Sequence, residues 1–172
     1  MRLVRFQGNS PEVSPTAYIA ETAVLIGDVK VGAHSSIWES AVLRGDWNKI
    51  DIGSHSSIQD NCTIHVTPSS PTTIGDRVTM EHNSMVHGAT IASNVVIGIG
   101  SVVLDDAIIK ETSMVAAGAV VPPKMVVPSR HLAAGVPAKV QKFKGDPEMF
   151  QLMAEGYVTL AEKYLDLRND NK

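Results

Sequence analysis

The chain of 172 residues contains a single cysteine and few aromatic residues. A lone cysteine excludes an internal disulfide and fits a reducing compartment, so we expect Cys62 to be a small buried apolar residue. Phe, Trp and Tyr make up only 5% of the chain, although 44% of it is hydrophobic. This shortage of large rings indicates a narrow core of Ile, Val and Ala in a single unit of domain size.

The sequence also lacks an excess of positive charge and a long apolar run. Its formal net charge is −3, so it has no broad basic field that would attract nucleic acid or an anionic membrane. No stretch of about 18 apolar residues offers a membrane span, and residues 1–9 lack the apolar core of a secretory signal. We therefore expect a soluble, cytoplasmic protein that acts on small molecules.

An aliphatic residue returns at every sixth position along most of the chain. This spacing matches neither the helical period nor the simple alternation of a strand. These spine positions are Ile19, Leu25, Val31, Ile37, Leu43, Ile52, Ile58, Ile64, Ile74, Met80, Val86, Ile91, Ile97, Val103, Ile109, Val115, Val121 and Val127. A period of six residues is the signature of a hexapeptide β-helix, in which three hexads of one strand and one corner each complete a triangular coil.

Small residues four places after the first spine positions fit inside the same prism. They are Ala23, Val29, Ser35 and Ala41. We predict an all-β fold, with a parallel β-helix and its N-terminal segment over residues 1–145 and a C-terminal α-helix and tail over residues 146–172 packed along it. The alternative is a β-sandwich with frequent turns, for which strands of irregular length would be expected.

Two interruptions of the hexads lie on either side of His65. They cover residues 45–51 and 66–73, and the second contains Pro68 and Pro71. Insertions in a solenoid map to loops and often build its binding face. We therefore expect two loops next to His65.

The pattern becomes helical after residue 145. Asp146 is suited to cap a helix, and Pro147 is suited to its first turn. Residues 168–172 are expected to fray. The apolar face expected for this helix comprises Met149, Phe150, Leu152, Met153, Tyr157, Leu160, Ala161, Tyr164 and Leu165.

The register of the repeat places two histidines in one column. His65 directly follows the spine residue Ile64, and His87 directly follows Val86, three hexads later. Because stacked strands lie about 4.8 Å apart, both imidazoles can reach one zinc ion with Zn–N bonds of about 2.0–2.1 Å. The same arithmetic places Arg44 one coil below His65.

His82 lies two places after the spine residue Met80, across a corner from this column. The five steps from His82 to His87 span up to about 16–18 Å when fully extended, so a metal shared within one chain would be strained. A metal between two subunits solves this, with His65 and His87 from one chain and His82 from the next. A closed ring of three chains would then hold three equal sites.

Polar residues stack beside His82. Asp60 holds the equivalent place one coil below it, and Gln59 lies one coil from Glu81. Such residues suit the orientation of ligands or of a bound water. For Asp60 and Arg44 the alternative is a salt bridge between subunits that holds a trimer together.

Three histidines on one zinc leave its fourth position open, as in catalytic sites. The metal lowers the pKa of its bound water from 15.7 to about 7, which yields hydroxide at neutral pH. Such a hydroxide attacks an electrophilic carbon. Carbon dioxide, esters and thioesters all qualify, and the residues do not choose among them.

Several motifs together resemble the γ-class carbonic anhydrases over nearly the whole chain. They are Arg44-Gly45-Asp46, Ile58-Gln59-Asp60-Asn61 leading to Ile64-His65, and His82 with His87. The resemblance implies a left-handed β-helix, a homotrimer, and zinc, iron or cobalt at the subunit boundary, bound by the three histidines. It further implies hydration of carbon dioxide to bicarbonate, with Gln59 positioning the reacting oxygen and Arg44, Asp46 and Asp60 organising the interface and the site.

The same resemblance implies that Tyr157 approaches the metal from the C-terminal helix, with ordinary helix packing as the alternative. The chain also departs from the family pattern. The archetypal enzyme has acidic proton shuttles in its loops, whereas this chain has Trp47 and Pro68 there. Glu81 stands where family members commonly have glycine, so it is either a replacement base or a group that quenches the site.

Three other functions stay open. The segments Ala116-Ala117-Gly118-Ala119-Val120-Val121 and Ala134-Gly135-Val136-Pro137-Ala138-Lys139 resemble the tail of hexapeptide-repeat acyltransferases, in which a histidine acts as general base on an acyl-CoA acceptor. A metal-dependent acyl-CoA thioesterase is the second possibility. A non-catalytic trimer that keeps its metal for assembly is the third.

Overall fold

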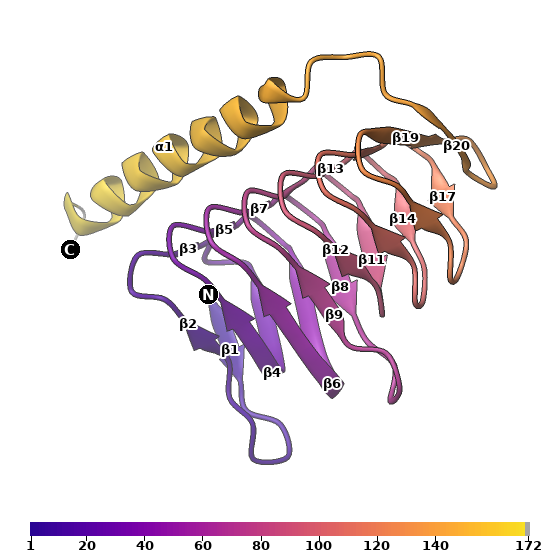
Figure 1. Cartoon of the computed structure of the whole chain (residues 1–172). Helices are drawn as coiled ribbons and strands as arrows, with labels where there is room; N and C mark the ends of the chain where they lie inside the picture. Colours follow the sequence, from indigo (N-terminus) through magenta and orange to yellow (C-terminus); the bar gives the residue numbers. More distant parts are fainter. Residues whose placement is uncertain (171–172) are drawn as a thin grey trace.

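The computed structural model describes residues 1–170 and shows a left-handed parallel β-helix followed by one α-helix (Figure 1). Short strands stack coil upon coil, so almost all their pairs are parallel. One sheet contains β3 (Tyr18–Ile19), β5 (Ser36–Ile37), β7 (Ser57–Ile58), β10 (Thr79–Met80), β13 (Val96–Ile97), β16 (Met114–Val115), β19 (His131–Ala134) and β20 (Lys139–Lys142). The fold predicted from the six-residue period is confirmed.

The other strands form a twelve-stranded sheet that bends around two sides of the prism. It contains β1 (Arg2–Val4), β2 (Glu12–Val13), β4 (Val24–Val31), β6 (Val42–Ile52), β8 (Thr63–His65), β9 (Thr72–Ile74), β11 (Met85–His87), β12 (Thr90–Ile91), β14 (Val102–Val103), β15 (Ile108–Ile109), β17 (Val120–Val121) and β18 (Val126–Val127). The long strands β4 and β6 belong to both sides, because each continues across a corner.

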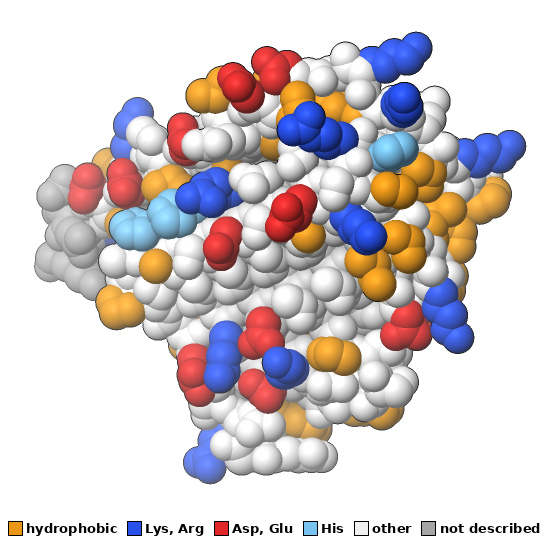
Figure 2. All heavy atoms as spheres, in the orientation of Figure 1, with side chains coloured by type: hydrophobic (Ala, Val, Ile, Leu, Met, Phe, Trp, Pro, Cys, Tyr) orange, Lys and Arg blue, Asp and Glu red, His pale blue; other side chains and the backbone are white. Residues whose placement is uncertain are grey.

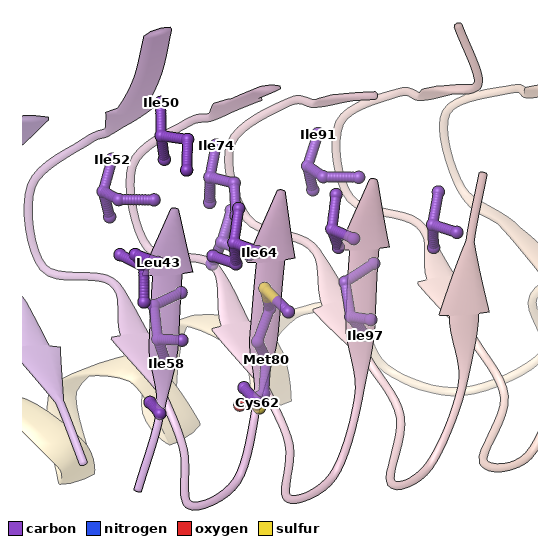
Figure 3. Packing of buried hydrophobic residues seen from close by; sticks show 14 of the residues in the cluster. Leu43, Ile50, Ile52, Ile58, Cys62, Ile64, Ile74, Met80, Ile91 and Ile97 are labelled. Atoms are coloured by element: carbon purple, nitrogen blue, oxygen red, sulfur yellow. Dashed lines mark hydrogen bonds between the residues drawn. The ribbon is translucent and has the colours of Figure 1, made fainter. Parts of the chain in front are cut away.

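The spine residues of the hexads form the core. Leu43 pairs with Ile64, Ile64 with Val86, and Val86 with Val103, so equivalent hexads lie directly above one another. Every spine residue is buried, and the branched side chains from successive coils point into one shared interior (Figure 3). Cys62 is fully buried among them, and burial raises the pKa of its thiol, as expected of an apolar packing residue.

The two interruptions of the repeat have different structures. Residues 66–71 form the expected loop, but residues 45–51 belong to the continuous strand β6, so the prediction of a loop there was wrong. The extra residues are absorbed because β6 pairs with β4 on both sides of a register shift between Gly27 and Val29. Asn48 ties the two interruptions together, since its amide donates to the carbonyls of Thr67 and Pro68 at 3.3 and 3.2 Å.

The helix α1 (Glu148–Asp170) runs back along the prism from the last coil toward the first (Figure 1). Asp146 caps it as predicted, since its carboxylate accepts the amide of Glu148 at 3.0 Å. Phe150, Ala154 and Ala161 are its most buried residues.

The buried stripe of α1 is narrower than the apolar face expected from the sequence. Met149, Leu152, Leu160 and Tyr164 belong to that expected face but are exposed. The reason is that the flat side of a prism contacts one stripe of a helix, whereas a globular core surrounds more of it. Within the described residues, no helix is long and apolar enough to cross a membrane.

An aromatic cluster attaches α1 to the first coils. Trp38 lies under the rings of Tyr157 and Tyr164, at centroid distances of 5.9 and 5.3 Å. Arg168 lies 5.1 Å over the ring of Tyr18 and donates to the carbonyl of Ile19 at 2.9 Å. The prediction that the chain frays was therefore wrong for Arg168. Helix α1 continues to Asp170, and residues 171–172 lie outside the described part.

Candidate metal centre

The parallel register brings His65 and His87 together as predicted. His65 ends β8 and His87 ends β11, and the two residues are direct partners in the ladder. Their ring centroids are 5.0 Å apart, and Nδ1 of His65 lies 3.0 Å from Nε2 of His87. The side chain of His65 is 11% exposed and that of His87 26%, so the pair lies at the edge of the core with access to solvent.

Each of these imidazoles also faces a carboxylate. The Nε2 atom of His65 lies 3.0 Å from Asp46, and the Nδ1 atom of His87 lies 2.5 Å from Asp105. Arg44 forms a salt bridge of 2.5 Å with the other oxygen of Asp46. Burial raises the pKa of Asp46, but the hydrogen bonds from Arg44 and His65 outweigh it and hold the pKa below its usual value.

The geometry of the pair fits a divalent metal. Two nitrogens bound to one tetrahedral zinc at 2.0–2.1 Å lie about 3.3 Å apart, and the facing nitrogens of His65 and His87 are 3.0 Å apart. Carboxylates behind both rings match the arrangement that orients metal-bound histidines. Neutral imidazoles of this kind are ligands for zinc, iron and cobalt alike.

His82 lies apart from this pair, as the register predicted. It follows β10 just as Asp60 follows the neighbouring strand β7, and its Nδ1 atom lies 2.9 Å from that carboxylate. Its side chain is 44% exposed, and its Nε2 atom has no protein partner within residues 1–170. Over the same residues, no group of three His, Cys, Asp or Glu side chains within one chain is able to hold a metal ion.

Gln59 is 2% exposed, and its side-chain amide makes no hydrogen bond within the described residues, although it is not one of their fully buried unpaired groups. Glu81, one coil above, is engaged in a corner of the solenoid, because its carboxylate accepts the amide of Ile99 at 3.1 Å. Tyr157 reaches the same region from α1: burial, followed by the charges of Glu81 and Asp60, raises the pKa of its phenol. The structure thus gathers Gln59, Asp60, Glu81, His82 and Tyr157 on one side of the prism.

Two features near the histidine pair were not assigned a role from the sequence. Asp105 was not considered, because the column of His65 and His87 continues one coil upward to Leu104, and Asp105 lies one place further on, in the corner after β14. Trp47 was noted only as a departure from the family pattern. Its ring lies 5.8 Å from that of His65 and is 62% exposed, beside a small polar recess of about 240 Å³ that Asp46 also lines.

A larger cavity of about 520 Å³ lies elsewhere, under the end of α1. Tyr18, Glu39, Tyr164 and Arg168 are among the residues that line it, and it includes none of the candidate metal ligands. On the face shown in Figure 2, acidic and basic side chains are interspersed over the coils. The candidate site is therefore identified by the histidines and carboxylates that lie close together, and not by the size of a cavity.

Comparisons with known proteins agree with this fold. No family model matches the chain. It is 38% identical over 161 residues to a mitochondrial γ-carbonic anhydrase of Arabidopsis thaliana, covering 89% of this chain but only 58% of the relative. It is also 38% identical over 152 residues to a probable carbonic anhydrase of Methanocaldococcus jannaschii, covering 87% of this chain and 96% of that protein.

Solved structures show the same architecture at full length. A hexapeptide transferase family protein of Anaplasma phagocytophilum matches with a TM-score of 0.92 and 41% identity, covering 95% of this chain and 98% of the other. A putative acetyltransferase of Bacillus cereus matches with a TM-score of 0.93 and 34% identity, covering 96% and 98%. The chain is thus a hexapeptide-repeat protein of the left-handed β-helix class. Within that class it belongs to the γ-carbonic anhydrase family.

Proposed function

We propose that this protein is a zinc-dependent enzyme that converts carbon dioxide and water into bicarbonate. The observation that carries the proposal is the pair of facing nitrogens of His65 and His87, 3.0 Å apart, with a carboxylate behind each ring. When bound there, a divalent metal would lower the pKa of a coordinated water, and its positive charge would stabilise negative charge that develops on oxygen. Iron and cobalt are the alternatives to zinc, because the same imidazoles bind them.

The third ligand in this proposal is His82 of a neighbouring subunit in a homotrimer. Two observations support it: the Nε2 atom of His82 has no partner in the described part of its own chain, and its side chain is 44% exposed. Asp60 accepts a hydrogen bond from the Nδ1–H group of His82, which leaves the lone pair of the neutral ring on Nε2, directed outward. Each boundary between subunits would then hold one site.

The remaining residues have positioning roles in the proposal. The side-chain amide of Gln59 is available to hydrogen-bond a reacting oxygen. Gln59 is only 2% exposed, so the packing around it restricts the movement of the side chain. Asp46, held by Arg44, orients His65. Tyr157 and Glu81 lie on the Gln59 side of the prism, where the raised pKa of Tyr157 keeps its phenol protonated at neutral pH. A protonated phenol is able to donate a hydrogen bond to the product.

The test is to measure metal content and the rate of carbon dioxide hydration on one preparation, for the wild type, His82→Ala and His131→Ala. We expect stoichiometric metal and hydration in the wild type, and loss of both in His82→Ala. His131 is the matched control, because within the described residues its imidazole makes a single, local hydrogen bond, to the carbonyl of Ser129. Stoichiometric metal in His82→Ala would contradict the shared site.

Acyl transfer or thioester hydrolysis is the second candidate, favoured by the matches to proteins named as a hexapeptide transferase and a putative acetyltransferase. A general base requires one histidine and no metal. Acyl-CoA turnover that survives metal removal would favour the transferase, and turnover that requires metal would favour the thioesterase. Metal binding with neither activity would indicate a non-catalytic trimer.

A further inference from the structure

Asp105 is the carboxylate that the site description leaves without a function. It lies in the corner that follows β14, one coil above His87, and its Oδ1 atom is 2.5 Å from Nδ1 of that ring. An ionised carboxylate only accepts hydrogen bonds, so Nδ1 of His87 must carry the proton. In a neutral ring the lone pair is then on Nε2, which is the atom that faces His65 at 3.0 Å.

We propose that Asp105 is a positioning residue of the metal centre, which fixes His87 in the tautomer and orientation that present Nε2 to the metal. This inference rests on the proposed function and adds a named residue to it. Asp105 acts from the coil above the histidine pair, while Asp46 acts from the coil below, so the two ligands are held from opposite sides along the prism axis.

Gly88 provides an independent observation. It follows His87 directly and has a φ of +58°, and a Cβ atom placed on it would lie 2.9 Å from the Asp105 carboxylate oxygen and 3.1 Å from Cβ of Ser70. Any side chain at position 88 would therefore push the carboxylate away from the ring. The absence of a side chain next to the ligand leaves the space in which Asp105 reaches His87.

The neighbouring Asp106 separates this role from a structural one. Asp106 accepts a hydrogen bond from the Ser70 hydroxyl at 2.7 Å and so ties the loop of residues 66–71 to the solenoid. The Asp105 side chain is 40% exposed and contacts only His87 among the hydrogen-bonding groups described. The carboxylate of Asp106 thus holds a loop, whereas the carboxylate of Asp105 contacts a candidate metal ligand.

The experiment compares Asp105→Asn with Asp106→Asn, which removes the same charge one residue away. Zinc affinity is measured by competition with a chromogenic chelator, and the cobalt-substituted protein is examined by visible absorption. We expect Asp105→Asn to weaken zinc binding by about 10- to 100-fold and to change the cobalt spectrum, with an unchanged melting temperature. Asp106→Asn should bind zinc as the wild type does.

Two further measurements keep the inference open to contradiction. Gly88→Ala should weaken zinc binding in the same direction, because it displaces the carboxylate. Nitrogen-15 NMR of the metal-free protein should show the Nδ1–H tautomer of His87 in the wild type and its loss in Asp105→Asn. Equal zinc affinity of Asp105→Asn and wild type would overturn the inference alone, whereas a wild type that binds no metal would overturn the proposed function itself.

Discussion

At the scale of single residues, each candidate ligand is paired with one aspartate from another coil. Asp46 faces His65, Asp60 faces His82, and Asp105 faces His87. Register arithmetic on the sequence found the stacking of Asp60 below His82, because both follow spine residues by two places. It could not find the contact of His87 with Asp105, since that contact depends on the path of a corner and on the space left by Gly88.

Gln59 leads to the first prediction. The Gln59 amide is not among the fully buried unpaired groups of the described residues, so Gln59→Leu, which removes the amide at similar volume, should leave the free energy of unfolding nearly unchanged. If the amide serves the reacting oxygen, hydration should fall by about 10²-fold at unchanged metal content. Stopped-flow hydration assays, metal analysis and thermal unfolding test this together. Wild-type turnover in Gln59→Leu would remove Gln59 from the proposed mechanism.

Two fully buried threonines give the second prediction. The hydroxyl of Thr79 has no partner among the residues described, so Thr79→Val should raise the free energy of unfolding by about 1 kcal/mol. Thr72 is the matched control, because its hydroxyl donates to the carbonyl of His65 at 2.7 Å and accepts the amide of Gly88 at 3.0 Å. Thr72→Val should lower that free energy by about 1–3 kcal/mol. Denaturant unfolding measures both, and equal changes would contradict this account.

At the scale of elements, the regular hexads are predictable and the departures from them are not. A two-residue strand such as β10 needs only one spine residue and its neighbour, and both are visible in the sequence. The eleven-residue strand β6 was mistaken for a strand and a loop, because its continuation depends on pairing with β4. That partner lies on the previous coil, beyond the reach of any local pattern.

Helix α1 gives the third prediction. Arg168 holds its last turns to the first coil through the Ile19 carbonyl and the ring of Tyr18, so Arg168→Gln should weaken this attachment by about 1 kcal/mol. Hydrogen exchange of the amides of residues 160–168 should become faster, while amides of the coils keep their protection. Lys163→Gln is the control, since the Lys163 side chain is exposed on the same helix. Equal exchange in the two variants would show that the aromatic cluster alone attaches α1.

At the scale of the whole molecule, one chain supplies two convergent histidines and leaves the third apart. The described residues of a single chain contain no group of three metal-binding side chains, although His65 and His87 alone have the right spacing. In the proposed trimer a second copy supplies the third ligand, so the site forms only when the subunits assemble. We expect native mass spectrometry to show three chains.

Mixed assembly is the fourth prediction. Neither His82→Ala nor His87→Ala should bind stoichiometric zinc alone. If the two variants are refolded together in equal amounts, random assortment in a ring should restore about one quarter of the sites, because His65 and His87 from one chain then meet His82 from the other. Zinc content and hydration rate report the restoration. If mixed trimers that contain both variants regain neither zinc nor hydration activity, the ligands are not shared between chains in the proposed way.

The prism and its interior follow from the amino-acid pattern alone, because every sixth side chain is aliphatic and is buried away from water. Stacking at a fixed strand spacing then aligns His65 with His87. The path of β6, the narrow contact of α1 and the position of the Asp105 carboxylate behind His87 are visible only once the chain is folded. These features depend on corners, on the flatness of a prism side and on the space next to a glycine. Those are properties of packed coils rather than of any local stretch of residues.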